Sequence, residues 1–234
     1  MIVLNARGKP FSWSYSSLTE FESCPSRFAA KRFFCTTVEA ETEQTLWGTR
    51  VRKAFEERIR DGVTFSEDFP PNYESWAKAL SQLPGEKQFE RKFAVRKNFA
   101  PCDFFDAGAW GRGVVDLLVL AEDTAVIIDY KTGKKKDDDT QLKIFAWFVV
   151  NEYDAKPFLK TLKYRYIWLK DNTTTGGELG YLEAKLVMNQ MSPRIDAMER
   201  AWNDQTFPCF PSGLCNGWCP VDECIHYRQR KEWK

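Results

Sequence analysis

The sequence predicts an α/β domain in which helices precede and follow a small mixed central sheet. Three observations lead to this prediction. Apolar residues recur at helical spacing over residues 47–60, alternate with the shorter period of strands from residue 89 onward, and return to helical spacing over residues 140–153. At 234 residues, with 43% hydrophobic residues, the chain is long enough to bury one core, and a single domain over residues 1–234 is expected.

The helices are predicted from amphipathic spacing and from signals at their ends. Near the N-terminus, Ser17 and Glu20 have the spacing of a capping box, and Pro25 interrupts the helix that follows. Asp61-Gly62 ends the most strongly amphipathic segment. The last predicted helix is either continuous or restarts at Pro193. Helices are expected at residues 17–24, 28–34, 47–60, 73–83, 140–153 and 183–204.

The strands are predicted from alternating or continuous apolar runs between turn residues. Residues 124–130 are almost wholly apolar, as in a strand that is covered on both faces. The segment TTTGG at residues 173–177 predicts a turn, and residues 205–234 contain too much Pro, Gly and Cys for a regular element. Strands are expected at residues 89–95, 110–120, 124–130 and 161–169.

Charge and hydropathy exclude several classes of protein. The chain has 34 basic and 33 acidic residues, so any surface that binds phosphates must arise from local segregation of charge. The N-terminal residues lack the apolar core of a signal peptide, and no apolar run is long enough to span a membrane. A soluble cytoplasmic protein that does not bind membranes is expected.

Two carboxylates and a lysine lie within the apolar strands. Asp116 lies inside one strand, Asp129 ends the next, and Lys131 leaves that strand on the same face as Asp129. A hairpin turn near residues 122–123 would bring the carboxylates together. Neighbouring carboxylates repel unless a cation lies between them, and hard oxygen ligands suit Mg²⁺ or Mn²⁺. The alternative is a structural Asp–Lys pair at the end of a sheet.

Several motifs together resemble a known family. These are GVVD at residues 113–116, DYKTGK at 129–134 and Gln141 at the start of a helix, together with SYSSLTEFESCPSRF near the N-terminus and the cysteine-rich tail. They resemble the PD-(D/E)xK nuclease superfamily, and most closely its RecB-like branch, which includes AddB, CRISPR-associated RecB-like nucleases and phage exonucleases. The resemblance implies a restriction-endonuclease-like core and metal-dependent cleavage of phosphodiester bonds.

The resemblance implies a role for each matching residue. Asp116 and Asp129 would be metal ligands, with the carbonyl of Tyr130 as a further ligand. Lys131 would activate water, and Gln141 would contact the scissile phosphate or hold that water. Glu90 matches an acidic residue of the same branch, with an ordinary solvated strand charge as the equal alternative.

Two positions depart from the pattern of that branch. Arg52 stands where RecB-like nucleases carry a metal-binding histidine, and a guanidinium cannot ligate a cation because it has no free lone pair. Arg52 could instead bind a phosphate, and Arg50 and Lys53 on the same helix could contact the DNA backbone, with an ordinary solvated helix face as the alternative. Phe145 replaces the tyrosine that the branch places four residues after the glutamine.

The tail cysteines predict a metal centre, with buried or free thiols as the alternative that involves no metal. An odd number of cysteines, seven, in a reducing compartment argues against a disulfide framework, and three of them, Cys215, Cys219 and Cys224, are clustered in the tail. His226 could complete a zinc site. Alternatively, and favoured here because AddB-like relatives resemble it, Cys24 completes a structural [4Fe–4S] cluster. A cysteine-cluster subdomain of residues 1–35 and 205–234 is then expected, and the other cysteines, Cys35, Cys102 and Cys209, are interpreted as ordinary ones.

The function that the resemblance implies is a Mg²⁺- or Mn²⁺-dependent DNA exonuclease acting at DNA ends. The tail looks most like phage proteins of replication or recombination, so the cytoplasm of a bacterial host and a single-strand binding or annealing protein are the expected location and partner. Two alternatives remain at this stage. One is a DNA-end-binding protein whose activity Arg52 impairs, and the other is a zinc-stabilised interaction protein.

Overall fold

The computed structural model describes residues 2–38, 41–153 and 159–228. Helices at both ends of the chain enclose a run of strands, as expected. In chain order the elements are α1 (Tyr15–Ser23), α2 (Pro25–Arg32), α3 (Glu43–Asp61), α4 (Asn72–Ser81), β1 (Glu86–Val95), β2 (Gly111–Leu120), β3 (Thr124–Lys131), α5 (Thr140–Glu152), β4 (Thr161–Trp168), β5 (Thr173–Gly180) and α6 (Tyr181–Asn203).

The described strands form one mixed sheet in the order β1-β2-β3-β4-β5. Only β3 and β4 run parallel, and α5 lies in the connection between them, because a parallel pair requires a long crossover. The other neighbouring strands are antiparallel. Residues 127–130 of the central strand β3 are all buried, which confirms the interpretation of its apolar run.

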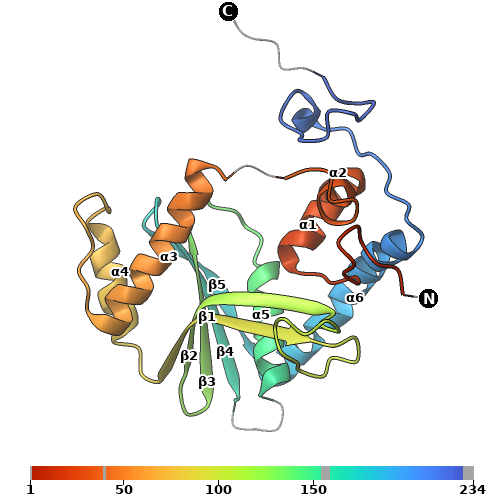
Figure 1. The fold of residues 1–234 in the computed structure, drawn as a ribbon. Coiled ribbons are helices and arrows are strands. Elements are labelled where there is room, and N and C mark those ends of the chain that lie inside the picture. Colours follow the sequence, from red (N-terminus) through yellow and green to blue (C-terminus); the bar gives the residue numbers. More distant parts are fainter. Residues whose placement is uncertain (1, 39–40, 154–158, 229–234) are drawn as a thin grey trace, which may run out of the picture.

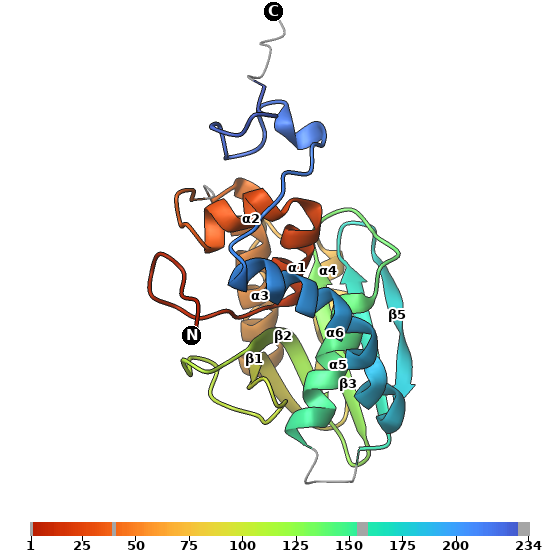
Figure 2. The same ribbon diagram turned by 90° about the vertical axis from the view of Figure 1, so that its right-hand side faces the viewer.

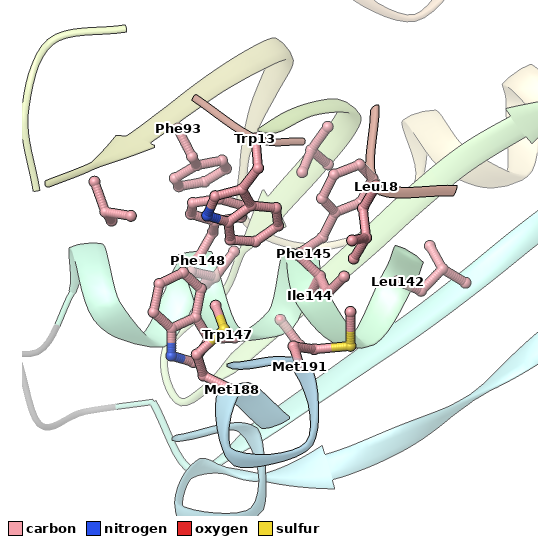
Figure 3. Packing of buried hydrophobic residues seen from close by; sticks show 14 of the residues in the cluster. Trp13, Leu18, Phe93, Leu142, Ile144, Phe145, Trp147, Phe148, Met188 and Met191 are labelled. Atoms are coloured by element: carbon pink, nitrogen blue, oxygen red, sulfur yellow. The ribbon is translucent and has the colours of Figure 1, made fainter. Parts of the chain in front are cut away.

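Helices cover both faces of the sheet (Figures 1 and 2). On one face, α5, α6 and the N-terminal segment enclose an aromatic cluster in which Trp13 and Phe93 both stack near Phe148, with centroid distances of 6.2 and 6.0 Å (Figure 3). On the other face, Phe55 of α3 stacks on Tyr130 of β3 at 4.6 Å. This arrangement confirms the predicted class, a mixed central sheet flanked by helices.

The N-cap of helix α1 lies three residues earlier than the sequence predicts. Ser14 is its N-cap, and the Ser17 amide donates to the Ser14 hydroxyl at 3.3 Å while the Ser14 amide donates to the Ser17 hydroxyl at 2.8 Å. The capping box assigned to Ser17 and Glu20 is therefore wrong. Glu20 is buried instead, and it pairs with Arg32 at 2.7 Å and Lys31 at 3.1 Å, because a buried carboxylate needs cationic partners.

The turn predicted at residues 173–177 is wrong, because these residues belong to β5. The strand pairs with β4 along its whole length, and its glycines permit a close approach to that neighbour. Gly176 has a φ of +152°, and a Cβ atom there would lie 2.0 Å from the carbonyl oxygen of Tyr164. The two glycines that suggest a turn thus serve close strand pairing.

Helix α6 is continuous through Pro193, so the helix does not restart there. Proline removes one backbone hydrogen bond from a helix interior. Met191 and Ile195, on either side of it, are 3% and 0% exposed and belong to the main core. Burial of the residues on both sides of the proline offsets the lost hydrogen bond and keeps the helix continuous.

The segment after α6 returns to the N-terminal helices. The Ser26 amide of α2 donates to the carbonyl oxygen of Pro208 at 3.2 Å. Beyond this contact the tail contains one short 3₁₀ turn, Gly213–Cys215, and it extends past α2 away from the sheet (Figures 1 and 2). The subdomain expected from residues 1–35 and 205–234 stays a prediction, and its residues 229–234 lie outside the described chain.

Among the described residues, the helices lack the length and apolar character that a membrane span requires.

Candidate active site

Asp116 and Asp129 lie where strands β2 and β3 separate. The antiparallel ladder between these strands ends at the pair Leu117–Ile128, and the same register would place Asp116 opposite Asp129 at the next step. Strand β3 continues to Lys131 by pairing with β4 instead. The predicted hairpin is confirmed, and both carboxylates are positioned at the fork that the diverging strands leave.

The Asp116 carboxylate is buried at this fork, with 7% of the residue exposed. Its Oδ2 atom accepts a hydrogen bond of 2.8 Å from the Tyr130 amide, which lies beyond the last β2–β3 pair. Its Oδ1 atom lies 3.8 Å from Arg52 Nη1. Burial, and then the neighbouring Asp129, raise the pKa of Asp116 well above the ordinary carboxyl value. The site therefore disfavours two negative charges unless a cation joins them.

Asp129, Lys131 and Gln141 form a connected line of polar contacts. The Lys131 ammonium lies 2.7 Å from Asp129 Oδ2 and donates to Gln141 Oε1 at 3.0 Å. Asp129 is 4% exposed, and burial raises its pKa although Lys131 opposes that shift. Strand β3 places Asp129 and Lys131 on one face, and the first turn of α5 brings Gln141 to the same place. The structure thus brings together these three predicted residues.

Tyr166 is a member of this group that the sequence analysis missed. Its hydroxyl donates to Gln141 Oε1 at 3.4 Å, and its ring lies 4.9 Å from the Lys131 ammonium. Tyr166 is aligned with Asp129 in the parallel β3–β4 pair. The alternating tyrosines in TLKYRYIWL could have indicated that a tyrosine lies near the site. The alignment of Tyr166 with Asp129, however, depends on the crossover through α5, which local sequence does not encode.

Glu90 lies on a distorted part of β1 opposite Asp116. The β1–β2 register pairs Phe89 with Leu117 and Arg91 with Val115, and omits Glu90. Its φ is +46°, a left-handed conformation that is uncommon for residues other than glycine. The Glu90 carboxylate lies 3.7 Å from Arg52 Nε. A strained acidic residue in this position favours a functional interpretation over that of an ordinary strand charge.

Arg52 of α3 bridges two of the candidate acidic residues, with one guanidinium nitrogen near Glu90 and another near Asp116. Its neighbours on the helix have local partners. Arg50 pairs with Asp68, and Lys53, which is 75% exposed, lies 3.7 Å from Glu57. Only Arg52 of the three predicted DNA-binding residues is therefore in contact with the candidate active site.

The oxygen atoms at the fork suit a divalent cation. Two buried carboxylates, both with a pKa raised by burial, form the hard, anionic ligand set that Mg²⁺ or Mn²⁺ prefers, and Mg²⁺ commonly keeps several of its waters. Asp116 and Asp129 would hold such an ion, with the Tyr130 carbonyl as a further candidate. Within the described part of the chain, no three His, Cys, Asp or Glu side chains are grouped as a metal site, so water or substrate would have to supply further ligands.

The cysteines of the described residues are free thiols. Cys24 occupies the N-cap position of α2, close in sequence to the contact between Ser26 and Pro208. The Cys224 thiol lies 3.7 Å from Cys209, a residue that the sequence analysis interpreted as ordinary. Among the described residues, neither Cys24 with the tail cysteines nor the tail cysteines with His226 form a group of three possible metal ligands, so a four-ligand centre stays a prediction.

Residues 12–224 match the PD-(D/E)XK nuclease superfamily, so the chain belongs to this superfamily. Members typically use Mg²⁺ or Mn²⁺ to hydrolyse phosphodiester bonds, and the fork carboxylates fit that use. Among solved structures, the protein SSO0001 covers 94% of this chain and 89% of its own at 9% identity, with a TM-score of 0.46. A "Putative exonuclease" from Eubacterium rectale shares 14% identity over 82% of each chain, also with a TM-score of 0.46. No functionally curated protein gives a significant sequence match.

Proposed function

We propose that the protein is a metal-dependent deoxyribonuclease that hydrolyses phosphodiester bonds from DNA ends. The observation that carries this proposal is the contact of Lys131 with both Asp129 and Gln141, beside a second buried carboxylate, Asp116. A structural Asp–Lys pair would need neither the second carboxylate nor the glutamine. The arrangement instead has the groups that cleavage by an activated water requires.

The proposed roles follow from the contacts of each side chain. A bound Mg²⁺ or Mn²⁺ would supply Lewis-acid stabilisation of a phosphoryl oxygen. Asp116 and Asp129 would bind that ion, while the Lys131 ammonium orients the attacking water and favours the loss of its proton to solvent by stabilising the resulting hydroxide. Gln141 and Asp129 hold the Lys131 ammonium at 3.0 and 2.7 Å, which restricts where it can act. Tyr166 keeps Gln141 in place through its 3.4 Å contact.

We propose exonuclease action rather than sequence-specific cleavage because the motifs of the chain resemble the RecB-like branch, which includes phage exonucleases. A phage protein of replication or recombination, working in the bacterial cytoplasm with a single-strand binding or annealing protein, is the biological setting that we propose with it. Purified protein incubated with Mn²⁺ is expected to degrade linear DNA and to leave closed circular DNA of the same sequence intact. Equal cleavage of both substrates would contradict action at ends.

The second candidate function is DNA-end binding without efficient cleavage. Arg52 favours it, because the guanidinium already lies beside two acidic side chains, Glu90 and Asp116, that a cation would also attract. Failure to degrade linear DNA at any Mg²⁺ or Mn²⁺ concentration, together with retained binding to ends, would support this candidate.

Replacing Arg52 by histidine is expected to strengthen Mn²⁺ binding at least several-fold. The change removes a competing cation and supplies an imidazole nitrogen, which is a good ligand for this class of ion. The measurement is the Mn²⁺ concentration that gives half-maximal cleavage, together with titration calorimetry. Lys53→His, one residue along α3 and 75% exposed, is the matched control. An unchanged Mn²⁺ dependence in Arg52→His would show that Arg52 does not occupy a ligand position.

We also propose a structural [4Fe–4S] cluster held by Cys24, Cys215, Cys219 and Cys224, with zinc bound by the three tail cysteines and His226 as the alternative. The contact between Ser26 and Pro208 supports the first set, since it brings the start of the tail back to the helix whose N-cap is Cys24. Protein purified without oxygen is expected to be brown and to contain about four iron and four sulfide per chain for such a cluster. Cys24→Ser should lose this iron while the control Cys102→Ser keeps it. Stoichiometric zinc with no iron would select the alternative.

A further inference from the structure

A large cavity opens beside the candidate active site. Its volume is about 1100 Å³, which exceeds the range of about 300–1,000 Å³ typical of small-molecule pockets. Residues of the N-terminal segment, α1 and the β1–β2 connection line it, and Gln141 lies on its wall. The cavity therefore reaches a residue that contacts Lys131, and its size suits part of a polymer better than a small ligand.

The charge of the cavity wall is mainly positive. Five basic residues line it, Arg7, Lys9, Lys31, Arg32 and Arg112, against one acidic residue, Asp106. Two of these, Lys31 and Arg32, pair with buried Glu20. Arg7 and Lys9 are exposed and have no ion-pair partner within the described part of the chain. Their charge is available to an anionic ligand.

The loop that carries these two cations is fixed in position. The Asn5 side chain accepts hydrogen bonds from the Arg7 amide at 3.0 Å and from the Lys9 amide at 2.9 Å. The Ala6 amide donates to the carbonyl oxygen of Phe33 at 2.8 Å, which ties the loop to the end of α2. The cations are thus presented from an ordered turn.

The part of the lining that comes from the β1–β2 connection presents an aromatic ring. Phe105 is 82% exposed, and Lys92 lies 5.1 Å from its centroid. A phenylalanine that is so exposed does not contribute to the core. An exposed ring beside a cation is the pairing that proteins use to bind unpaired bases, since the ring stacks on a base while the cation attracts the backbone.

Arg112 connects the two parts of the lining. Its guanidinium donates to the carbonyl oxygens of Phe104 at 2.7 Å and Asp106 at 3.0 Å, on the two sides of Phe105. It also donates to the hydroxyl of Ser12 at 2.5 Å, on the N-terminal segment. The aromatic ring and the basic turn are therefore held at one site by a half-buried cation.

We propose that this cavity binds a single-stranded segment of the DNA chain whose scissile phosphate lies at the fork. Phe105 stacks on a base of that segment, and Arg7 and Lys9 contact its phosphates. The proposal rests on the proposed nuclease function and adds to it a preference for unpaired DNA next to the cleavage site. A protein partner is a poorer match, because the wall is basic and interface cores are depleted in charged residues.

Binding of a fluorescein-labelled 20-nucleotide oligothymidine, measured by anisotropy with Ca²⁺ in place of the catalytic ion, tests the proposal. Phe105→Ala is expected to weaken binding about five- to 100-fold, the range for loss of one stacked base. A combined Arg7→Gln and Lys9→Gln variant should weaken binding and reduce the slope of log K against log salt by about 0.7 for each cation lost. The controls are Phe210→Ala, an exposed aromatic in the tail, and a combined Lys78→Gln and Lys170→Gln variant.

The outcomes separate this inference from the proposed function. Wild-type affinity in both cavity variants would overturn the inference, and cleavage of linear DNA by the same variants at wild-type rates would leave the nuclease proposal standing. Weaker binding in the cavity variants, with wild-type protein that cleaves no DNA, would support the strand site and contradict the nuclease. If the cavity variants lose as much affinity for a blunt DNA duplex as for oligothymidine, the assignment of the cavity to unpaired bases would be overturned.

Discussion

Replacing Lys131 by methionine is expected to lower the rate of DNA cleavage about 100- to 10,000-fold, the usual contribution of a positioned proton-transfer group. Methionine keeps most of the side-chain volume but removes the ammonium that lies 2.7 Å from Asp129 and 3.0 Å from Gln141. DNA affinity should change little, because a single charge at the fork is a small part of the contact with DNA. Single-turnover cleavage and anisotropy, measured on the same protein, separate the two effects.

The Lys131 variant also removes the ion-pair partner of a buried carboxylate, so its folding must be checked. Thermal unfolding should be recorded with and without Mn²⁺, and Lys131→Arg provides a second variant that keeps the charge at Asp129. The matched control is Lys135→Met, an exposed position four residues along the chain. A folded Lys131→Met protein that cleaves DNA at the wild-type rate would remove Lys131 from the active site.

Replacing Asp116 by asparagine is expected to abolish both cleavage and stabilisation by Mn²⁺, yet to raise the stability of the metal-free protein. The residue is 7% exposed, and burial and Asp129 raise its pKa in the folded state. Asparagine removes this buried charge and can still accept the hydrogen bond from the Tyr130 amide. Removing an unfavourable buried charge of this kind is expected to add about 0.5–2 kcal/mol to the free energy of unfolding.

The pH dependence gives this prediction a distinct signature. Because the pKa of Asp116 is raised on folding, the folded state binds more protons than the unfolded chain above the ordinary carboxyl pKa. The wild-type free energy of unfolding therefore falls as pH rises from that value towards the raised one. The advantage of Asp116→Asn should be absent at low pH and grow across this window. Thermal unfolding in metal-free buffers of increasing pH measures it, with exposed Asp171→Asn as control. An Asp116→Asn variant that is less stable than wild type at every pH would contradict the inference that the buried Asp116 charge destabilises the metal-free protein.

Local sequence was sufficient for the parts of the site that lie on one hairpin. The apolar run of β3 and the turn residues at 122–123 predicted a hairpin, and with it the proximity of Asp116 and Asp129. Side-chain alternation along a strand then placed Lys131 beside Asp129. These inferences succeed because periodicity reports directly which side chains a strand buries.

Contacts between distant segments could not be predicted from the sequence. The strand β5 was mistaken for a turn, because Gly176 and Gly177 serve close pairing with β4, and pairing is not a local property. The position of Tyr166 next to Gln141 depends on the α5 crossover, and the bridge from Arg52 to Glu90 depends on how α3 packs over β1.

The sequence alone determined the class of fold, the residues of the fork and the presence of a cysteine-rich tail. Each of these follows from the types and spacing of residues within one continuous segment. The tertiary structure decided which cations meet those carboxylates and how a basic turn, an exposed phenylalanine and Gln141 come to line one cavity. The physical reason is that the alternation of buried and exposed residues is a local property of a strand or helix. Contacts between loops that are distant in the sequence depend on how the whole chain packs.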